Sequence, residues 1–266
     1  MTNAKKKSTL PFIANTQGCS RRDFLKTAGM LTLLSFSKKL YAIGDSSKID
    51  FAQIIYQGGN WQPRPTALRR LAWETQKRTS VDTLLEPSTI KPSVSKLATH
   101  PLTYLSGDRS FLPFDIETIG GFKKYLLTGG TLIIDPSFTP DADTEGFQKS
   151  VQNFMSQLFP DKTPQKIMPD HVIFNTFYKL NRAEGMVKST PWLTGYFIDN
   201  RAAVIITSHD LSGAYEMDNL GNWINDVTPG GTRQRENAFR LGINLIMYAL
   251  CGDYKSEESH KHLLPS

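Results

Sequence analysis

Cysteine is scarce in this chain. Its 266 residues include two, Cys19 and Cys251, and Cys251 is the only one beyond residue 42. A single cysteine forms neither an internal disulfide nor a cysteine-ligated zinc site, which excludes both kinds of cross-link from that part of the chain. Long apolar runs are missing as well. The uncharged run at residues 27–37 has eleven residues, whereas a membrane-spanning helix needs about 20.

Several catalytic and nucleotide-binding signatures are also absent. The sequence contains no Gly-x-Ser-x-Gly, no Gly-x-Gly-x-x-Gly and no Gly-Lys-Ser/Thr. It therefore gives no support to a serine nucleophile elbow or to a phosphate-binding loop. Metal-ligand spacings such as His-x-x-x-His are missing too. Metal binding would have to use separate oxygen and nitrogen donors, such as Asp135, His209 and Asp210.

Excess basic charge is confined to one end of the chain. The formal net charge is +6 and the isoelectric point is near 9.2. Residues 1–42 hold eight Lys/Arg and one acid, whereas the rest hold 23 basic and 24 acidic residues, a net of −1. Nucleic-acid binding depends on a basic surface that contacts phosphates. We therefore expect no nucleic acid among the partners of the region after residue 42.

The basic end carries an export motif. Residues 20–26 read Ser-Arg-Arg-Asp-Phe-Leu-Lys, with the arginine pair at Arg21 and Arg22, and the uncharged run follows directly. This predicts a twin-arginine signal peptide at 1–42, cleaved after Ala42, with the twin-arginine translocase as a partner and a periplasmic location. A retained signal would instead hold the protein at the membrane surface. The domain is then predicted at 43–255, followed by a flexible tail at 256–266.

Apolar runs alternate with amphipathic stretches through the predicted domain. The pattern predicts strands at 51–56, 81–85, 102–105, 131–134 and 202–206, and helices at 66–78, 115–127, 145–158 and 234–250. Several strands are apolar throughout, which is typical of a parallel sheet covered by helices on both faces. We therefore predict an α/β fold, a three-layer α/β/α arrangement around an open, mostly parallel sheet of the flavodoxin type. The less regular residues 161–192 are expected to add extra strands or a lid.

Polar residues follow the predicted strands. Open parallel sheets bind ligands beyond the carboxyl ends of their strands, so these residues are candidates for a site. The candidate ligand-binding residues are Gly58, Gly59, Asn60, Trp61, Asp108, Arg109 and His171. The candidate catalytic residues are Asp135, His209, Asp210 and Glu216. In a hydrolase the carboxylates and the histidine would serve as general base and acid, and Asn60 or nearby backbone N–H groups would stabilise an oxyanion.

Each candidate also has a structural explanation. The glycine pair would suit a tight turn, because glycine tolerates positive φ. Asp135 would suit a turn cap, Asp108 would suit an ion pair with Arg109, and His171 would suit a hydrogen-bonded loop position. His209 is the stronger functional candidate because it comes directly after a buried strand. The sequence leaves these alternatives open and names no cofactor.

Several stretches of the chain resemble the DUF4159 family. They are residues 56–61, 101–107, 122–135, 159–160, 169–174, 201–205, 210–211 and 241–244, within a total of about 49–251. The resemblance implies a class I glutamine amidotransferase-like α/β fold. The amidotransferase cysteine has no counterpart here, since Ser106, Gly107 and Asp108 follow the third predicted strand. Some relatives are joined to membrane segments, which implies a membrane-protein partner in the cell envelope.

Two functions therefore remain open. The first is an exported binding module of the cell envelope that recognises a ligand or partner at the strand ends or with a loop beside them. The alternative is a hydrolase-like enzyme that uses carboxylates and histidine at the same edge. The enzyme requires Asp135 and His209 to lie at one end of the sheet and within reach of one reacting atom.

Overall fold

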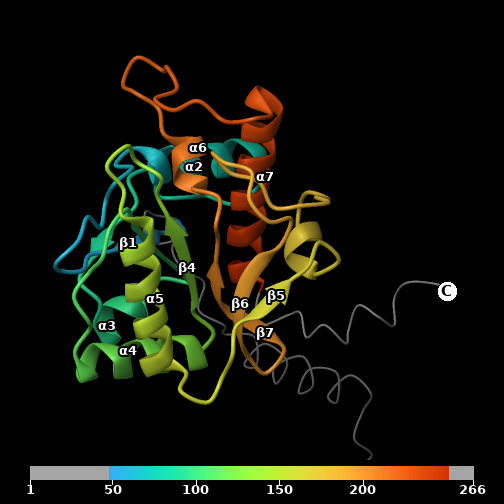
Figure 1. The fold of residues 1–266 in the computed structure, drawn as a ribbon. Coiled ribbons are helices and arrows are strands. Elements are labelled where there is room, and N and C mark those ends of the chain that lie inside the picture. Colours follow the sequence, from blue (N-terminus) through green and yellow to red (C-terminus); the bar gives the residue numbers. More distant parts are fainter. Residues whose placement is uncertain (1–47, 252–266) are drawn as a thin grey trace, which may run out of the picture. The chain divides into compact units, whose positions relative to one another are not determined.

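A computed structural model describes residues 48–251 (Figure 1). The arginine pair at Arg21 and Arg22, the expected cleavage point at Ala42 and the tail at 256–266 all lie outside the described residues. Within 48–251, no helix combines the length and the apolar character that crossing a membrane requires.

The described residues form one seven-stranded sheet in the order β2-β1-β3-β4-β7-β6-β5. The strands are β1 Phe51–Ile54, β2 Thr89–Ile90, β3 Leu102–Gly107, β4 Thr131–Pro136, β5 Gln165–Ile167, β6 Leu193–Ile198 and β7 Arg201–Ile206. All pairs from β2 to β7 are parallel, and β6 and β5 continue the sheet antiparallel at one edge. The prediction of a mixed α/β fold with a mostly parallel sheet is therefore confirmed. The parallel part follows the flavodoxin strand order when β7 is counted as its fifth strand.

Helices cover both faces of the sheet, in two layers. The helices are α2 Ala67–Arg78, α3 Val94–Leu97, α4 Ile116–Leu127, α5 Thr144–Leu158, η2 Val172–Asn175, α6 Leu211–Tyr215 and α7 Gly231–Leu250. Helices α2, α6 and α7 contact one another, and α4 contacts α3 and α5 to form the second layer. Because both faces are covered, every residue of β3 and β4 is buried, as the continuous apolar runs predicted.

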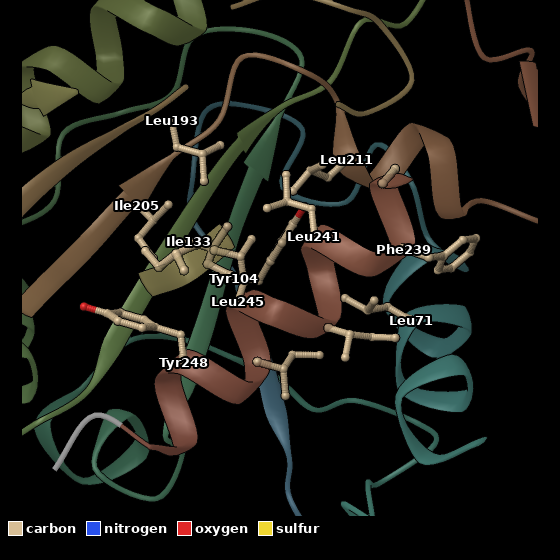
Figure 2. Packing of buried hydrophobic residues seen from close by; sticks show 14 of the residues in the cluster. Leu71, Tyr104, Ile133, Leu193, Ile205, Leu211, Phe239, Leu241, Leu245 and Tyr248 are labelled. Atoms are coloured by element: carbon tan, nitrogen blue, oxygen red, sulfur yellow. The ribbon is translucent and has the colours of Figure 1, made fainter. Parts of the chain in front are cut away.

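Local sequence explains where these helices begin. Asp115 caps α4 by accepting a hydrogen bond from the backbone N–H of Thr118 at 2.7 Å, and Asp143 caps α5 through Gly146 at 2.9 Å. The four predicted helices are present within three residues of their predicted bounds. On the α7 side, side chains from helix and sheet interdigitate in one apolar cluster (Figure 2). The rigid sheet that results fixes where each strand-end loop starts.

The prediction of a strand at 81–85 is wrong. Thr83 forms only an isolated bridge with Ile49, and its hydroxyl donates to the carbonyl of Ala72 in α2. The strand that pairs with β1 at the edge of the sheet is β2, after Pro87. Proline has no N–H for a ladder, so it separates the bridge from the strand. Of the extra strands or lid expected within 161–192, the structure shows one strand, β5, and β6 begins just after that region.

Candidate functional site

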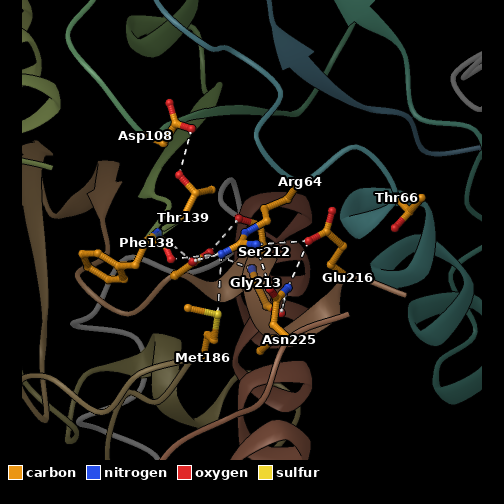
Figure 3. Close-up of polar contacts among 12 residues, drawn as sticks. Arg64, Thr66, Asp108, Phe138, Thr139, Met186, Ser212, Gly213, Glu216 and Asn225 are labelled. Carbon is orange, nitrogen blue, oxygen red and sulfur yellow. Dashed lines mark hydrogen bonds and ion pairs between the residues drawn. The ribbon is translucent and has the colours of Figure 1, made fainter. Parts of the chain in front are cut away.

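The four candidate catalytic residues lie at the same end of the sheet, within or beyond the carboxyl ends of β4 and β7. Figure 3 shows Glu216 with Arg64 and other polar residues of this end. Asp135 belongs to β4, His209 and Asp210 follow β7, and Glu216 ends α6. All four are buried, with Glu216 the most exposed at 4%. Their placement meets the first requirement of the hydrolase hypothesis, which is a common edge. The second requirement, reach toward a substrate, depends on what each group already contacts.

Asp135 accepts five hydrogen bonds from its own protein. The hydroxyls of Tyr104, Thr207 and Ser212 donate to it at 2.6, 2.5 and 2.8 Å. The backbone N–H groups of Leu211 and Ser212 donate at 3.0 and 2.9 Å. Both carboxylate oxygens are thus occupied, and the group anchors the start of α6 to β4. Burial, followed by the negative charge of Asp135, raises the pKa of Tyr104 well above its ordinary value.

Asp210 is equally enclosed and has an unusual backbone. Its φ of 48° is left-handed, which is uncommon outside glycine. Its side chain accepts from Arg64 at 2.8 Å and from the N–H groups of Phe138 and Gly213 at 2.8 and 2.7 Å. The Ser212 hydroxyl adds a longer contact at 3.3 Å. Asp210 therefore ties the loops after β1, β4 and β7 together.

Arg64 carries the positive charge of this cluster. It bonds Asp210, Glu216 at 3.2 Å and the amide oxygen of Asn225 at 2.9 Å, with 6% of its side chain exposed. Asn225 in turn donates to Glu216 at 3.0 Å. Burial and the charge of Asp135 raise the pKa of Asp210, and Arg64 opposes that rise. Sequence analysis missed Arg64, because it lies in a proline-rich loop with no motif around it.

His209 is a neutral, fully buried side chain. Its Nε2–H donates to the carbonyl of Thr190 at 2.7 Å, and its Nδ1 accepts from the N–H of Ser208 at 3.2 Å. Burial lowers the pKa of His209 below its ordinary value. A Cβ on Gly185 would lie 2.3 Å from the carbonyl oxygen of His209, so the loop is packed directly against it. Both ring nitrogens are thus used to hold loops together.

The glycine pair lies where the strand order reverses between β1 and β3, the usual ligand position in such sheets. Gly58 has a φ of 79°, and a Cβ on it would lie 2.5 Å from Cγ of Leu112. A Cβ on Gly59 would lie 2.6 Å from the carbonyl oxygen of Ser110. The loop after β1 therefore packs directly against the loop after β3. In this structure the glycines serve loop-to-loop contact at the switch point.

Asp108 links these two loops to the loop after β4. It accepts from Asn60 at 2.9 Å, from Arg109 at 2.9 Å and from Thr139 at 3.0 Å, and its side chain is 3% exposed. Burial alone would raise the pKa of Asp108, but these hydrogen bonds outweigh it and hold the pKa below its ordinary value. Trp61 is partly buried, and its carbonyl accepts a 2.6 Å hydrogen bond from a β1 glutamine. The structure brings these predicted ligand residues together as supports for one another.

His171 does not join this group. Its Nδ1 accepts from the N–H of Ile173 at 3.2 Å, and its ring lies 6.0 Å from the rings of Phe197 and Tyr248. Phe197 pairs with Ala202 near the start of β7, whereas His209 follows the end of β7. His171 is therefore at the opposite end of the sheet.

The described residues 48–251 contain no group of three or more His, Cys, Asp or Glu side chains that could hold a metal ion. The geometry of the donors that the sequence suggested gives the reason. The oxygens of Asp135 and Asp210 face N–H and O–H donors, and the ring nitrogens of His209 face backbone groups. These three side chains do not form a convergent set of free ligands.

An open pocket of about 340 Å³ lies beside the strand ends, between α2 and the chain that leaves α6. Its lining residues are Thr66, Arg69, Arg70, Trp73, Leu85, Glu86, Met217, Asp218 and Asn219. None of these was predicted as a site residue. They come from the outer face of α2 and from two irregular segments, so no strand end or motif marks them in the sequence.

Comparison with known proteins identifies a family. The family model described as Domain of unknown function (DUF4159) matches residues 50–250, which is more than half of the chain. Among curated proteins, none matches the chain. The chain therefore belongs to the DUF4159 family.

Proposed function

We propose that this DUF4159 domain is a binding module of the cell envelope, exported by the twin-arginine route, and that its polar strand-end cluster is structural. One observation carries the proposal. Asp135, His209 and Asp210 are buried, and both polar atoms of each side chain are engaged by groups of the same protein. Glu216 is buried as well, and its Oε2 is engaged by Arg64 and Asn225. A general base must reach a proton on the substrate, and these groups face inward.

The shifted pKa values agree with this interpretation. A raised carboxylate pKa in a cleft is often a sign of an active site, but buried ion-pair networks shift pKa values as well. For Asp210 the cause is burial together with the nearby charge of Asp135. For His209 the largest cause is burial, which lowers the pKa, while the hydrogen bond to Thr190 and the charge of Asp135 oppose the shift. Both shifts are what enclosure of a polar group in a folded core produces.

The cluster has a clear mechanical consequence. Arg64, Asp210, Glu216 and Asn225 connect the loop after β1 with the segment that follows α6. Surface loops that are held by buried partners lose less conformational entropy when they bind, so they bind more tightly. The network therefore supports a preformed recognition surface beside the strand ends.

Fold and localisation extend the proposal. The strand order and the missing nucleophile suit a non-catalytic relative of the class I glutamine amidotransferase-like fold. The motif at Arg21 and Arg22 supports export, and a membrane protein of the envelope is the proposed partner.

Replacing both arginines with lysine should leave the protein in the cytoplasm, as measured by fractionation. A variant with Lys5 and Lys6 changed to arginine is the matched control and should be exported. Equal export of both variants would contradict the route.

Enzyme assays test the functional half. Asp135→Asn, Asp210→Asn and His209→Gln should be compared with the native chain on chromogenic ester, amide, phosphate and glycoside substrates. We expect no turnover above that of the heat-denatured protein for any of them. Turnover by the native chain that disappears in a variant with native circular dichroism would overturn the binding-module proposal and favour the hydrolase.

A further inference from the structure

We propose that the pocket beside α2, together with the hairpin at residues 216–225, binds a segment of a partner protein that carries a large apolar side chain next to an aspartate or glutamate. This inference rests on the proposed function and specifies its recognition site. Figure 1 shows the hairpin within the segment that extends from the end of α6. Met217 and Trp223 pair across it, and Gly221 turns its tip with a φ of 88°.

The pocket is the right size for a side-chain anchor. At about 340 Å³ it lies at the small end of the range of ligand sites, which run from about 300 to 1,000 Å³. The surface around it is apolar well beyond the pocket. The exposed fractions are 38% for Trp73, 41% for Leu85, 88% for Leu220, 40% for Trp223 and 53% for Ile224. Trp73 and Leu85 line the pocket, and the other three belong to the hairpin. Exposed apolar side chains on a pocket and on the segment beside it are typical of an interaction surface.

The arginines at the pocket indicate which residue of the partner lies next to its apolar side chain. Arg69 bonds Glu86 through Nε, and Arg70 bonds Glu74 through one terminal nitrogen. An arginine has five N–H donors, so Arg69, with 52% of its side chain exposed, keeps donors for a ligand. The Arg70 guanidinium lies 4.3 Å from the centre of the Trp73 ring with 25% of its side chain exposed, and its terminal nitrogens keep N–H donors as well. Both acids of the lining are already engaged. Glu86 accepts from Arg69, and Asp218 accepts from Leu220 and Asn222 within its own turn. The pocket therefore offers unused donors for a carboxylate, and arginine is well suited to bind one.

The hairpin is held in place before any partner arrives. The hydroxyl of Thr66 donates to the carbonyl of Met217 at 2.7 Å and accepts from its N–H at 3.3 Å. At the base of the hairpin, Arg64 bonds both Glu216 and Asn225. These contacts fasten the hairpin to the start of α2 and keep the pocket open. Thr66 is thus a positioning residue, because it acts through Met217.

A protein partner is favoured over a membrane surface by the local charge. Binding to anionic lipid relies on clusters of lysine and arginine around the apolar residues. Besides the buried Glu216, the segment at 216–226 contains Asp218 and Asp226 and no basic residue. Acids beside an inserted apolar tip would be repelled by such a surface. Two arginines at the pocket instead suit a single carboxylate on a polypeptide.

The test is selection of a displayed random heptapeptide library on the full-length protein purified from the periplasm. We expect enriched peptides that place Phe, Trp, Leu or Met beside Asp or Glu. The affinity of a synthetic copy, measured by calorimetry, should fall at least tenfold for Arg69→Glu and for Leu220→Ser. Lys149→Glu and Ile116→Ser are matched controls, being 70% and 92% exposed on other helices, and should bind normally. Native circular dichroism of all four variants confirms folding.

Other outcomes overturn the inference in distinguishable ways. Peptides that bind all four variants as well as the native chain, or a library that yields no enriched peptide, would overturn the site. The binding-module proposal would still stand in the first case if the substrate panel shows no turnover. Pelleting with phosphatidylethanolamine and phosphatidylglycerol vesicles that is lost in Leu220→Ser would identify the hairpin as a membrane contact instead. Peptide binding that survives Arg69→Glu but not Leu220→Ser would overturn the requirement for an aspartate or glutamate in the partner segment.

Discussion

Arg64 and Asp210 form a buried ion pair between positions 146 residues apart, with Nη2 2.8 Å from Oδ2. The pair joins the loop after β1 to the end of β7, at the point where Asp210 adopts a left-handed backbone. Strained backbone persists only where the surroundings hold it, and here the guanidinium and two N–H groups do so. This contact therefore determines how α6 leaves the sheet.

Removing the arginine should destabilise the fold strongly. Arg64→Met leaves Asp210 and Glu216 as buried charges without their cation, which costs about 3–5 kcal/mol of unfolding free energy. Urea denaturation measures the loss. Arg69→Met is the matched control, because its pair with Glu86 is 52% and 71% exposed and should contribute less than about 1 kcal/mol. Equal losses for the two variants would show that the buried pair stabilises the fold no more than the exposed pair does.

Glycine substitutions should differ in sign. Gly58→Ala forces a side chain into positive φ and against Leu112, so it should lower the unfolding free energy by more than about 1 kcal/mol. Gly120→Ala lies inside α4 with nothing within 4 Å of the new Cβ. This substitution should raise the unfolding free energy by about 0.5–1 kcal/mol, because alanine loses less backbone freedom than glycine when the helix folds. Thermal unfolding measures the stability of both variants against the native chain. A Gly58→Ala variant that is more stable than the native chain would contradict the loop packing described above.

His100 should stabilise the fold at low pH. Its Nε2 lies 3.2 Å from the carboxylate of Asp50 and its Nδ1 lies 2.8 Å from the carbonyl of Lys96, so the charged form satisfies both acceptors. The hydrogen bond to Asp50 raises the pKa of His100 above 6.5, and burial opposes this. Its contribution is then complete below 6.5 and is lost as pH rises through the folded-state pKa. His100→Asn should cost more stability at pH 5.5 than at pH 9.

The control for that comparison is Asp50→Asn. The amide carries no charge, so the extra cost of His100→Asn at pH 5.5 should largely disappear in this background. Urea denaturation of the native chain, the two single variants and the double variant gives the cost of His100→Asn in each background at each pH. A cost that is the same at both pH values in the native background would contradict the raised pKa.

His209 should titrate in the opposite direction. Burial lowers the pKa of His209 below 6.5, and its Nδ1 accepts a hydrogen bond from the N–H of Ser208. The unfolded chain then binds a proton that the folded chain does not, so this residue reduces stability as pH falls below 6.5. In an NMR titration the His209 ring should show a midpoint below 6.5, and the neutral ring should carry its proton on Nε2. A midpoint at or above 6.5 would contradict the buried backbone contacts.

The elements of the fold were largely predictable from sequence, for local reasons. Continuous apolar runs identified β3, β4 and β7, and Asp115 marked the start of α4, because burial pattern and capping depend on neighbouring residues. The exception was the strand placed at 81–85, where Pro87 and the bridge at Thr83 divide the segment. Parallel strands also put Asp135 and His209 at one edge, as the hydrolase hypothesis required.

The polar cluster was not predictable in this way. Arg64 lies in a loop with no motif, and Tyr104 and Thr207 lie in or directly after a predicted strand, where nothing marks their hydroxyls as partners of Asp135. The partners of all three are distant in the chain. The sequence by itself determined which elements form and at which edge their polar ends gather, because periodicity, caps and strand direction are local properties. Only the tertiary structure decided that those polar groups satisfy one another and that the open surface lies beside α2. Hydrogen bonds between distant loops exist only once the sheet has brought the loops together.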